Sequence, residues 1–449
     1  MAQTLSEIVG SQNMEDPSSH PAKLYSIDGM IPKVVLFPGN IEEVSQILTF
    51  SSQERESIIP WGNGTKMGWG NIPSKVDRVV NTKRLDRITD CEEENLTATV
   101  EAGVPLVKVQ AHLRGLGRGY FIPLDPPFTQ AATIGGIVAS NSSGPKRYLY
   151  GTARDLILGM KVILPNGKIN SWGGKSVKNV AGYDMCKLYI GSFGTLGIIG
   201  EVTFRLLPLP EKERTLVAVF RESRAAFEAV SGILQSELLP SAIEISNLKV
   251  FEVLGFELSG KSGKVLLAVG FEGFHESVER QIRQVKERVE SSSPFCVYLL
   301  EGAHQDRFWT GLRDFESIAY LRFPDTISCR VNVPISKTGD VFRLWKEMMD
   351  EKGLDLGLRC HAGSGIVYAD ILMNDPNLGT EEWFKILRKA REAIRNLEGG
   401  MVIQKASPLL KKQIDVWGTP GKDFSLIQNL KARFDPDRLL NPGRFVGGI

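Results

Sequence analysis

Glycine-rich segments are the part of this 449-residue chain whose residue types and spacing could do chemistry, by binding an anion. Of the 45 glycines, 21 lie between positions 60 and 200. Runs of small residues can turn successive backbone N–H groups inward around a phosphate, and a nearby threonine adds a hydroxyl donor. Three segments have this character: 60–66, then 123–127 with 132–144, and then 178–184 with 191–199. Each alone is also typical of an ordinary turn, but their order and spacing favour one pyrophosphate site.

Two other glycine motifs match nucleotide-binding patterns but lack the required context. Residues 255–262 read Gly-Phe-Glu-Leu-Ser-Gly-Lys-Ser, a phosphate-loop pattern that needs a strand before it and a helix after it. A strand-like run, 265–269, follows instead, so a turn between strands is expected rather than nucleotide hydrolysis. Residues 115–119 end an expected helix instead of opening one, which disfavours a dinucleotide-binding Rossmann site.

The overall composition disfavours several other classes of protein. The 54 basic and 52 acidic side chains give a net charge of +2, so no global field recruits nucleic acid or an anionic membrane. The amino terminus lacks a secretory signal and no apolar run approaches the roughly 20 residues that span a bilayer, so a cytoplasmic protein is expected. The five cysteines are scattered, with no Cys-x-x-Cys pair, which disfavours an iron–sulfur cluster or a zinc ribbon.

The elements that must position the glycine segments have an α+β pattern. A strand-like run at 34–37 precedes a helix capped by Asn40. A second helix is expected to begin at Pro105 and to end at Gly117. A hairpin is expected around the turn signal Asn166-Gly167. The strand candidates of this region are 58–59, 97–101, 157–164, 168–172 and 198–206.

A proline-rich hinge at 208–210 separates this region from a more regular alternation of strands and helices, which indicates a second α+β domain of two β-α-β halves. Its strand candidates are 216–220, 243–245, 265–271, 327–333, 366–372 and 401–404. The chain length also favours more than one domain. The expected divisions are a lead-in over 1–30, a domain over 31–210, a second domain over 211–420 and a carboxyl-terminal segment over 421–449.

Four ordered motifs carry a resemblance to a known family: 62–66, Thr133-Ile134-Gly135-Gly136, Tyr150-Gly151-x-x-x-Asp155 and 194–199. Together they resemble the FAD-binding domain of the vanillyl-alcohol oxidase/PCMH flavoprotein family, and the ending 434–444 resembles that family's carboxyl terminus. The likeness covers residues 30–210 and 300–449 and is nearest to the glycolate oxidase and D-lactate dehydrogenase branch. Segments 61–70, 143–147 and 178–184 are most similar to the E-subunit type of glycolate oxidase.

The resemblance implies a fold, a cofactor and a set of binding residues. The fold is a PCMH-type FAD-binding domain of two α+β subdomains, a ferredoxin-like α+β cap domain over the flavin ring, and a carboxyl-terminal segment that returns to the first domain. FAD is expected to be held noncovalently, because relatives that attach it use a His in the first glycine segment or a Cys in the second, and this chain has neither. The residues expected to bind FAD are Gly62, Asn63, Gly64, Thr65, Lys66, Pro123, Asp125, Thr133, Ile134, Gly135, Gly136, Asn141, Ser143, Gly144, Tyr150, Gly151, Asp155, Gly197, Ile198, Ile199 and Asn441.

The same resemblance implies an FAD-dependent oxidoreductase that converts a 2-hydroxy acid, such as glycolate or D-lactate, to the 2-oxo acid. His361 is the candidate base for the hydroxyl proton, and Arg359 or Arg313 is the candidate anchor for the carboxylate. Arg359 and His361 alternate along a strand-like run, so both should face the same side. Surface pairing or a satisfied core position is the alternative for each residue. No metal site is expected, because segment 359–365 holds one His where catalytic relatives carry a His-rich metal motif.

Electrons from a reduced flavin need an acceptor, and the sequence has no cysteine cluster or dinucleotide site to receive them. The resemblance implies an iron–sulfur subunit and a sister flavoprotein subunit as partners, through which the chain would lie at the periphery of a membrane. Two alternatives stay open: a self-sufficient D-2-hydroxyacid dehydrogenase, and a flavin-carrying scaffold subunit that does not oxidise substrate.

Overall fold

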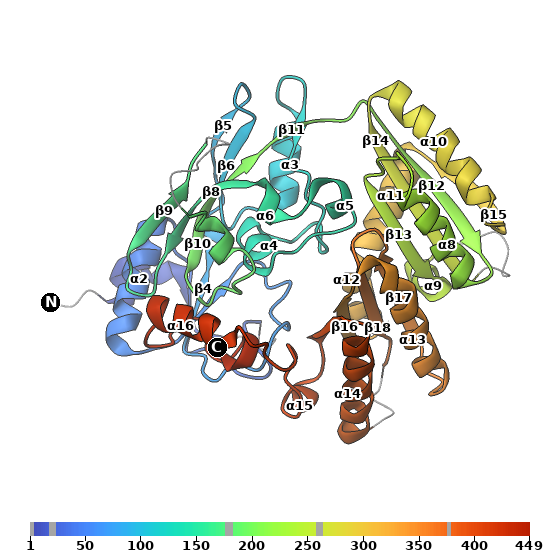
Figure 1. Cartoon of the computed structure of the whole chain (residues 1–449). Coiled ribbons are helices and arrows are strands. Elements are labelled where there is room, and N and C mark those ends of the chain that lie inside the picture. Colours follow the sequence, from blue (N-terminus) through green and yellow to red (C-terminus); the bar gives the residue numbers. More distant parts are fainter. Residues whose placement is uncertain (1–3, 18–23, 176–182, 257–263, 375–378) are drawn as a thin grey trace. The chain divides into compact units, whose positions relative to one another are not determined.

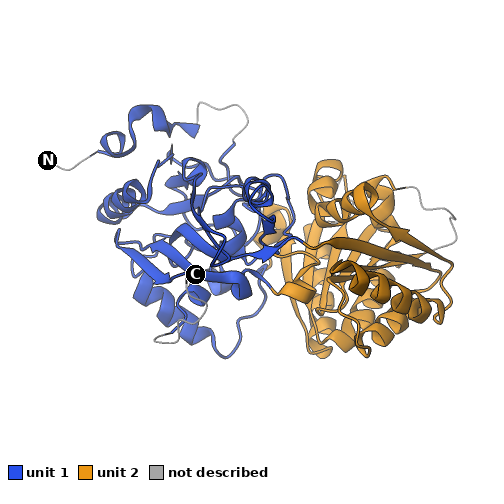
Figure 2. Cartoon of the chain, turned by 90° about the horizontal axis from the view of Figure 1, so that it is seen from above, with its two compact units in different colours: residues 1–142, 152–209, 415–449 blue, residues 143–151, 210–414 orange. Residues whose placement is uncertain are grey.

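The computed structural model describes residues 4–17, 24–175, 183–256, 264–374 and 379–449 (Figure 1). The chain forms two compact α+β units (Figure 2). Unit 1 contains residues 1–142, 152–209 and 415–449, and unit 2 contains residues 143–151 and 210–414. The expected boundary at 210 therefore lies within one residue of the observed one. The segment 143–151, which the sequence placed in the first domain, instead groups with unit 2.

Unit 1 contains a small, mostly parallel sheet of strand order β1-β2-β4-β3. Its strands are β1 (Met14–Glu15), β2 (Val34–Leu36), β3 (Ile58–Trp61) and β4 (Arg78–Asn81), with only β1 antiparallel to its neighbour. Helix α2 (Ile41–Glu54) begins after Asn40, as predicted, and the Asn40 side chain accepts the amide of Glu43 at 2.8 Å. The apolar side of α2 packs with Leu36, Ile58 and Val80 in one core.

The second sheet of unit 1 is antiparallel and five-stranded, in the order β5-β6-β10-β8-β9. The predicted hairpin is confirmed, with Gly167 at a φ of +81° in its turn. Helix α3 ends at Arg114 rather than at the predicted Gly117, because Gly115 already caps it. The strands are β5 (Ile88–Glu92), β6 (Thr97–Glu101), β8 (Ile157–Ile163), β9 (Ile169–Gly173) and β10 (Ile198–Arg205), with a separate pair β7 (Tyr120–Phe121) and β11 (Leu207–Pro208). The other helices of unit 1 are α1 (Leu5–Val9), α3 (Leu106–Arg114), α4 (Ile134–Ser140), α6 (Ala153–Leu156), α7 (Cys186–Tyr189) and α16 (Phe424–Phe434).

Unit 2 is built on one eight-stranded antiparallel sheet of order β15-β12-β14-β13-β17-β18-β16-β19. Its first four strands and its last four each have the order of a ferredoxin-like β-α-β-β-α-β fold, and β13 joins β17 between the two halves. The strands are β12 (Lys212–Phe220), β13 (Ala242–Asn247), β14 (Val265–Gly273), β15 (Cys296–Leu300), β16 (Ile327–Asn332), β17 (Leu356–His361), β18 (Ile366–Ile371) and β19 (Gly400–Lys405). The expected α+β class is confirmed, and each half is a four-stranded β-α-β-β-α-β unit rather than the expected β-α-β unit.

Helices pack on this sheet, and one of its two faces is partly polar. The helices of unit 2 are α5 (Arg147–Tyr150), α8 (Ser223–Leu234), α9 (Leu248–Leu254), α10 (His275–Glu290), α11 (Gly302–Arg313), α12 (Phe315–Arg322), α13 (Thr338–Asp350), α14 (Thr380–Asn396) and α15 (Pro408–Lys411). The face that carries Val217 and Ala268 packs against α9, α11 and α12 in one apolar core. Glu244 is the cross-strand partner of Ala268 and His361 is the partner of Glu244, so both polar side chains share this face.

Candidate functional site

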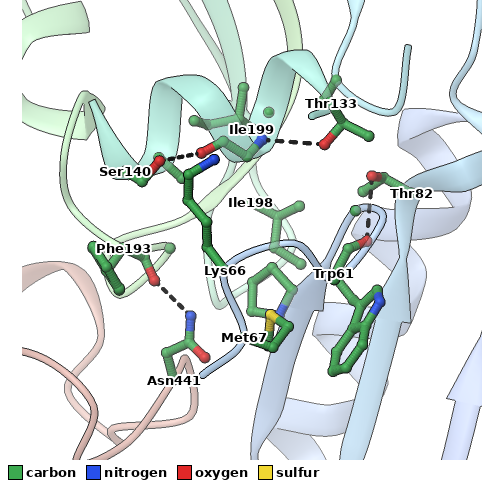
Figure 3. Close-up of a pocket in the computed structure, with 18 of the residues that line it drawn as sticks. Trp61, Lys66, Met67, Thr82, Thr133, Ser140, Phe193, Ile198, Ile199 and Asn441 are labelled. Atoms are coloured by element: carbon green, nitrogen blue, oxygen red, sulfur yellow. Dashed lines mark hydrogen bonds between the residues drawn. The ribbon is translucent and has the colours of Figure 1, made fainter. Parts of the chain in front are cut away.

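A pocket in unit 1 brings together the first glycine segment, residues 133–140 of the second, residues 193–199 of the third, and the turn after α16 (Figure 3). Residues 178–182 of the third segment lie outside the described residues. The first segment leaves β3 as a loop. Within the described part of the chain, the N–H groups of Gly62, Asn63, Gly64 and Thr65 donate to no protein acceptor. The Asn63 Nδ2 donates to the Ala131 carbonyl at 2.9 Å and so ties this loop to the second segment. Successive unsatisfied amides that line a pocket are suited to an anion.

The second segment reaches the pocket through α4. The Thr133 Oγ1 accepts the Gly136 amide at 3.4 Å, and it lies so close to Gly62 that a Cβ there would approach it to 2.3 Å. A Cβ at Gly135 would lie 2.9 Å from the Ala102 Cβ, and the Gly135 amide already donates to the Ala102 carbonyl. Gly135 is therefore needed for the close packing of α4 against Ala102. Among the described residues, the Thr133 hydroxyl is the only group close to the position of a Cβ at Gly136.

The carboxyl-terminal turn closes the pocket from another side. The Asn441 Nδ2 donates to the Phe193 carbonyl at 2.5 Å (Figure 3). The buried Arg444 donates through Nη2 to the carbonyls of Met67 and Trp69 at 2.7 and 2.6 Å. These bonds hold the glycine loop after β3 in its bent form. Residues 415–449 are therefore part of the site although they lie far from it in the sequence.

A second group of polar residues lies in unit 2, on the partly polar face of its sheet. The His361 Nδ1 lies 2.6 Å from the Glu244 Oε1, and both residues are buried. Burial, and then the charges of Arg147, Arg359 and Arg330, lower the pKa of His361 well below its ordinary value of 6.5. The imidazole is therefore neutral at pH 7, and its Nδ1–H donates to the Glu244 carboxylate. This assignment leaves Nε2 as a proton acceptor.

Arg359 shares the face of His361, as predicted, but it is tied into the protein. Its Nη2 lies 3.2 Å from the Glu316 Oε1 and 3.0 Å from the Asp370 Oδ2. Its Nη1 donates to the Leu312 carbonyl at 3.4 Å. Leu312, Glu316 and Asp370 are all buried. Because the two carboxylates lie next to the guanidinium away from water, they neutralise the Arg359 charge. Arg359 therefore has the alternative role considered from the sequence, that of a buried arginine whose hydrogen bonds and charge are satisfied within the protein.

Arg313 is the last residue of α11 and is partly buried. Its Nη2 donates to the Thr310 hydroxyl at 3.0 Å, and its buried Nε has no hydrogen-bond partner among the residues that the structure describes. Arg313 thus keeps capacity for a further acceptor.

Comparisons with known proteins match both units. The FAD binding domain model covers residues 32–172, and the model of the C-terminal domain of FAD linked oxidases covers residues 209–445. The glycolate oxidase subunit GlcD of Bacillus subtilis is 32% identical over 98% of this chain and 95% of its own length. The D-lactate dehydrogenase of Archaeoglobus fulgidus is 30% identical, over 92% of this chain and 91% of its own. The chain belongs to the family of FAD-linked oxidases.

Solved structures agree with this fold. A p-cresol methylhydroxylase with bound substrate has a TM-score of 0.78 at 15% identity, over 99% of this chain and 95% of that one. A 4-ethylphenol oxidase from Gulosibacter chungangensis has a TM-score of 0.76 at 16% identity, over 98% and 95% of the two chains. The predicted resemblance to the PCMH-type flavoprotein family is confirmed. The narrower likeness to the E-subunit type stays a prediction, since the relatives named here are a D subunit and a D-lactate dehydrogenase.

FAD is the cofactor of this FAD-linked oxidase, and the pocket of unit 1 fits it. The four unsatisfied amides of 62–65 suit a pyrophosphate, and the short approach of Gly62 to Thr133 leaves no room for a side chain between the two segments. Apolar groups such as Met67 and Ile198 line the same pocket and suit an aromatic ring system.

The structure brings twelve of the predicted FAD-binding residues together in this pocket. They are Gly62, Asn63, Gly64, Thr65, Lys66, Thr133, Gly135, Gly136, Gly197, Ile198, Ile199 and Asn441. Ten further residues line the pocket and were not among the expected FAD-binding residues, although most of them lie within the same sequence motifs. These are Pro60, Trp61, Met67, Thr82, Ala102, Ala139, Ser140, Phe193, Gly194 and Arg444. Thr82 and Ala102 carried no signal, because they come from strand ends brought close only by the fold.

The other predicted FAD-binding residues do not line this pocket. Ile134 is fully buried in the apolar core of the five-stranded sheet, and Asn141 ends α4 with a φ of +46°. Asp155 accepts the Thr152 amide in a capping box at the start of α6. The residues that group with unit 2 are Ser143, Gly144, Tyr150 and Gly151. Pro123 and Asp125 are buried outside the pocket lining.

Tyr150 has a defined role within unit 2. Its hydroxyl donates to the Glu272 Oε1 at 2.6 Å, and Lys146 forms an ion pair with the same carboxylate at 2.6 Å. These bonds attach α5 to β14, which is the physical reason that 143–151 groups with unit 2.

Three further sequence expectations bear on other activities. Among the described residues, no three His, Cys, Asp or Glu side chains gather in a way that could hold a metal ion. None of the described helices is both long and apolar enough to cross a bilayer. Gly255 ends α9 with a φ of +70°, and most of the phosphate-loop pattern after it, 257–262, lies outside the described residues.

Proposed function

We propose that this FAD-linked oxidase oxidises a small 2-hydroxy acid, such as glycolate or D-lactate, to the corresponding 2-oxo acid. The names of the relatives support this substrate class, since they include a glycolate oxidase subunit and a D-lactate dehydrogenase. The observation that carries the proposal is the His361–Glu244 pair, which presents a neutral imidazole whose Nε2 has no hydrogen-bond partner among the described residues.

The reaction removes one proton from the hydroxyl group and one hydrogen, with its electron pair, from the carbinol carbon. When bound, FAD supplies the acceptor for that hydride. His361 Nε2 takes the hydroxyl proton, so that the oxygen can form the carbonyl of the 2-oxo acid. Glu244 acts through His361 as a positioning residue: it fixes the tautomer and stabilises the imidazolium that forms. The substrate carboxylate needs a guanidinium that is not already neutralised, which disfavours Arg359.

The test is the rate at which substrate bleaches the bound flavin under anaerobic conditions. His361→Asn should slow flavin reduction by about 100- to 10,000-fold, because general-base catalysis contributes that much, while the FAD content stays unchanged. His304→Asn, at an exposed position of α11, is the matched control. An unchanged rate in His361→Asn would remove the histidine from the mechanism.

We also propose that FAD is held noncovalently and that the electrons leave the chain to partners, an iron–sulfur subunit and a sister flavoprotein subunit. The sequence supports both points, since the two glycine segments contain neither His nor Cys and no Cys-x-x-Cys pair exists. Acid denaturation should release all flavin and leave a colourless chain. Flavin mass retained on the denatured chain would contradict noncovalent binding, and purification of the tagged chain from its host without iron–sulfur protein would contradict the partners.

A further inference from the structure

A row of three side chains crosses the second ferredoxin-like half of unit 2. Arg330 on β16 pairs with Tyr368 on β18, and Tyr368 pairs with Arg359 on β17. Directly paired residues project from the same face of an antiparallel sheet, with Cβ atoms about 4.5–5.5 Å apart. His361 lies two residues beyond Arg359 and therefore shares this face. Its ring contacts Tyr368 edge-on, with centroids 5.2 Å apart.

The two arginines of this row differ in what neutralises them. Arg359 is held by Glu316 and Asp370, and Asp370 is itself fixed by the Ser328 hydroxyl at 2.6 Å. Arg359 also lies over the Tyr368 ring at 5.0 Å, so its guanidinium is enclosed on several sides. A substrate could reach it only by displacing buried carboxylates, which is costly.

Arg330 has no such partners. Its side chain is partly exposed, and within the described residues no carboxylate lies within ion-pair distance of it. Its Nε is buried without a hydrogen-bond acceptor. Arg330 pairs with Tyr368 across the strands, and the Tyr368 ring contacts His361, so Arg330 and His361 lie on either side of this tyrosine. The Arg330 charge is also among those that lower the pKa of His361. An arginine whose N–H donors have no acceptor, next to a neutral histidine, is suited to bind an anion.

We propose that Arg330 binds the carboxylate of the substrate while the His361 Nε2 faces its hydroxyl group. The inference rests on the proposed function, since it assigns a role at the same site. A guanidinium fork binds a carboxylate through two parallel hydrogen bonds, and this fixes the orientation of the neighbouring carbon. The anchor restricts the enzyme to hydroxy acids, because an alcohol without a carboxylate would leave the Arg330 charge and its buried Nε unpaired.

Binding of oxalate to the FAD-loaded full chain, measured by titration calorimetry, tests the anchor without requiring turnover. Oxalate is an unreactive carboxylate that offers the same oxygen pair as the substrate. Arg330→Gln should weaken oxalate binding, and raise the KM for glycolate and D-lactate, by about tenfold to a hundredfold. The value of kcat should change much less. Arg343→Gln, at a surface ion pair on α13, is the matched control and should change neither.

The outcomes separate this inference from the proposed function. Oxalate binding by Arg330→Gln that equals the unaltered chain would overturn the anchor, as would an unaltered chain that binds no oxalate. Binding that depends on Arg330 in a chain that oxidises neither acid would support the anchor and contradict the proposed function. If Arg330→Gln fails to retain FAD, Arg330→Met, which keeps the length of the aliphatic stem, replaces it. Weaker oxalate binding by Arg330→Met would support the role of Arg330, and unchanged binding would overturn it.

Discussion

At the scale of single residues, the chemistry depends on which nitrogen of His361 carries the proton. The Glu244 carboxylate accepts from Nδ1, while burial and three arginines, Arg147, Arg359 and Arg330, keep the ring neutral. A base whose pKa lies below 6.5 stays unprotonated through neutral pH. The rate of flavin reduction should therefore be constant from pH 8 to below 6.5 and fall only in more acidic solution.

Replacing Glu244 with Gln should change that profile in a defined direction. Loss of the negative charge lowers the pKa of His361 further and weakens it as a base. The rate on the plateau should drop at least about tenfold, with KM nearly unchanged, and the acid limb should move to lower pH. The pH dependence of flavin reduction measures both effects. A Glu244→Gln variant that loses flavin or stability but keeps the position of the acid limb would show a merely structural carboxylate.

The His361 pKa also affects stability, and the sign can be stated. The unfolded imidazole binds a proton below about pH 6.5, whereas the folded one does not until the pH is lower. This contribution to the free energy of unfolding is therefore present above pH 6.5 and is lost as the pH falls through the unfolded pKa towards the folded one.

At the scale of elements, the carboxyl-terminal turn acts as a clamp on the first glycine loop. Arg444→Ala removes two hydrogen bonds from a buried guanidinium to the carbonyls of Met67 and Trp69. We expect a loss of about 1.5–3 kcal/mol in the free energy of unfolding and weaker FAD retention, because the loop amides lose their fixed positions. Thermal denaturation and the flavin-to-protein absorbance ratio check this.

Arg433→Ala, at an exposed position of α16, is the control for the clamp and should behave like the unaltered chain. Full flavin retention in Arg444→Ala would show that the loop holds its shape without the carboxyl-terminal segment.

The sequence predicts a helix or strand well where neighbouring residues determine it. The Asn40 cap, the Asn166-Gly167 hairpin and the alternation of strands and helices after residue 210 were all readable, because each depends on neighbouring residues. The placement of 143–151 was not, since it depends on bonds from Tyr150 and Lys146 to Glu272, more than 120 residues away.

The same limit applies to the candidate site. His361 and Arg359 were found from their types and alternation, but the two carboxylates that neutralise Arg359 come from α12 and β18. Glu244 and Arg330 had no local signal at all, because only the sheet register brings β13 and β16 to the strands beside His361 and Tyr368. The sequence therefore provided candidate residues, and only the long-range pairing shows which of them are already neutralised by other side chains.

At the scale of the whole molecule, the cofactor pocket and the base lie in different units, which matches the separate family models for the two parts of the chain. Each unit has its own cores and can be tested by itself: FAD retention reports on unit 1, and oxalate binding reports on the polar face of unit 2. Oxidation of substrate requires both. The rate of substrate oxidation by the full chain therefore tests the roles proposed for both units together.

Oxidation of a 2-hydroxy acid by this chain can be tested by stoichiometry on the purified, FAD-loaded chain without oxygen and without partners. Glycolate or D-lactate is added in excess, the loss of oxidised flavin is followed by absorbance, and the 2-oxo acid is quantified. We expect the flavin to bleach and one glyoxylate or pyruvate to form for each flavin reduced. A chain that retains FAD and yet leaves it oxidised with both acids would contradict the proposed function.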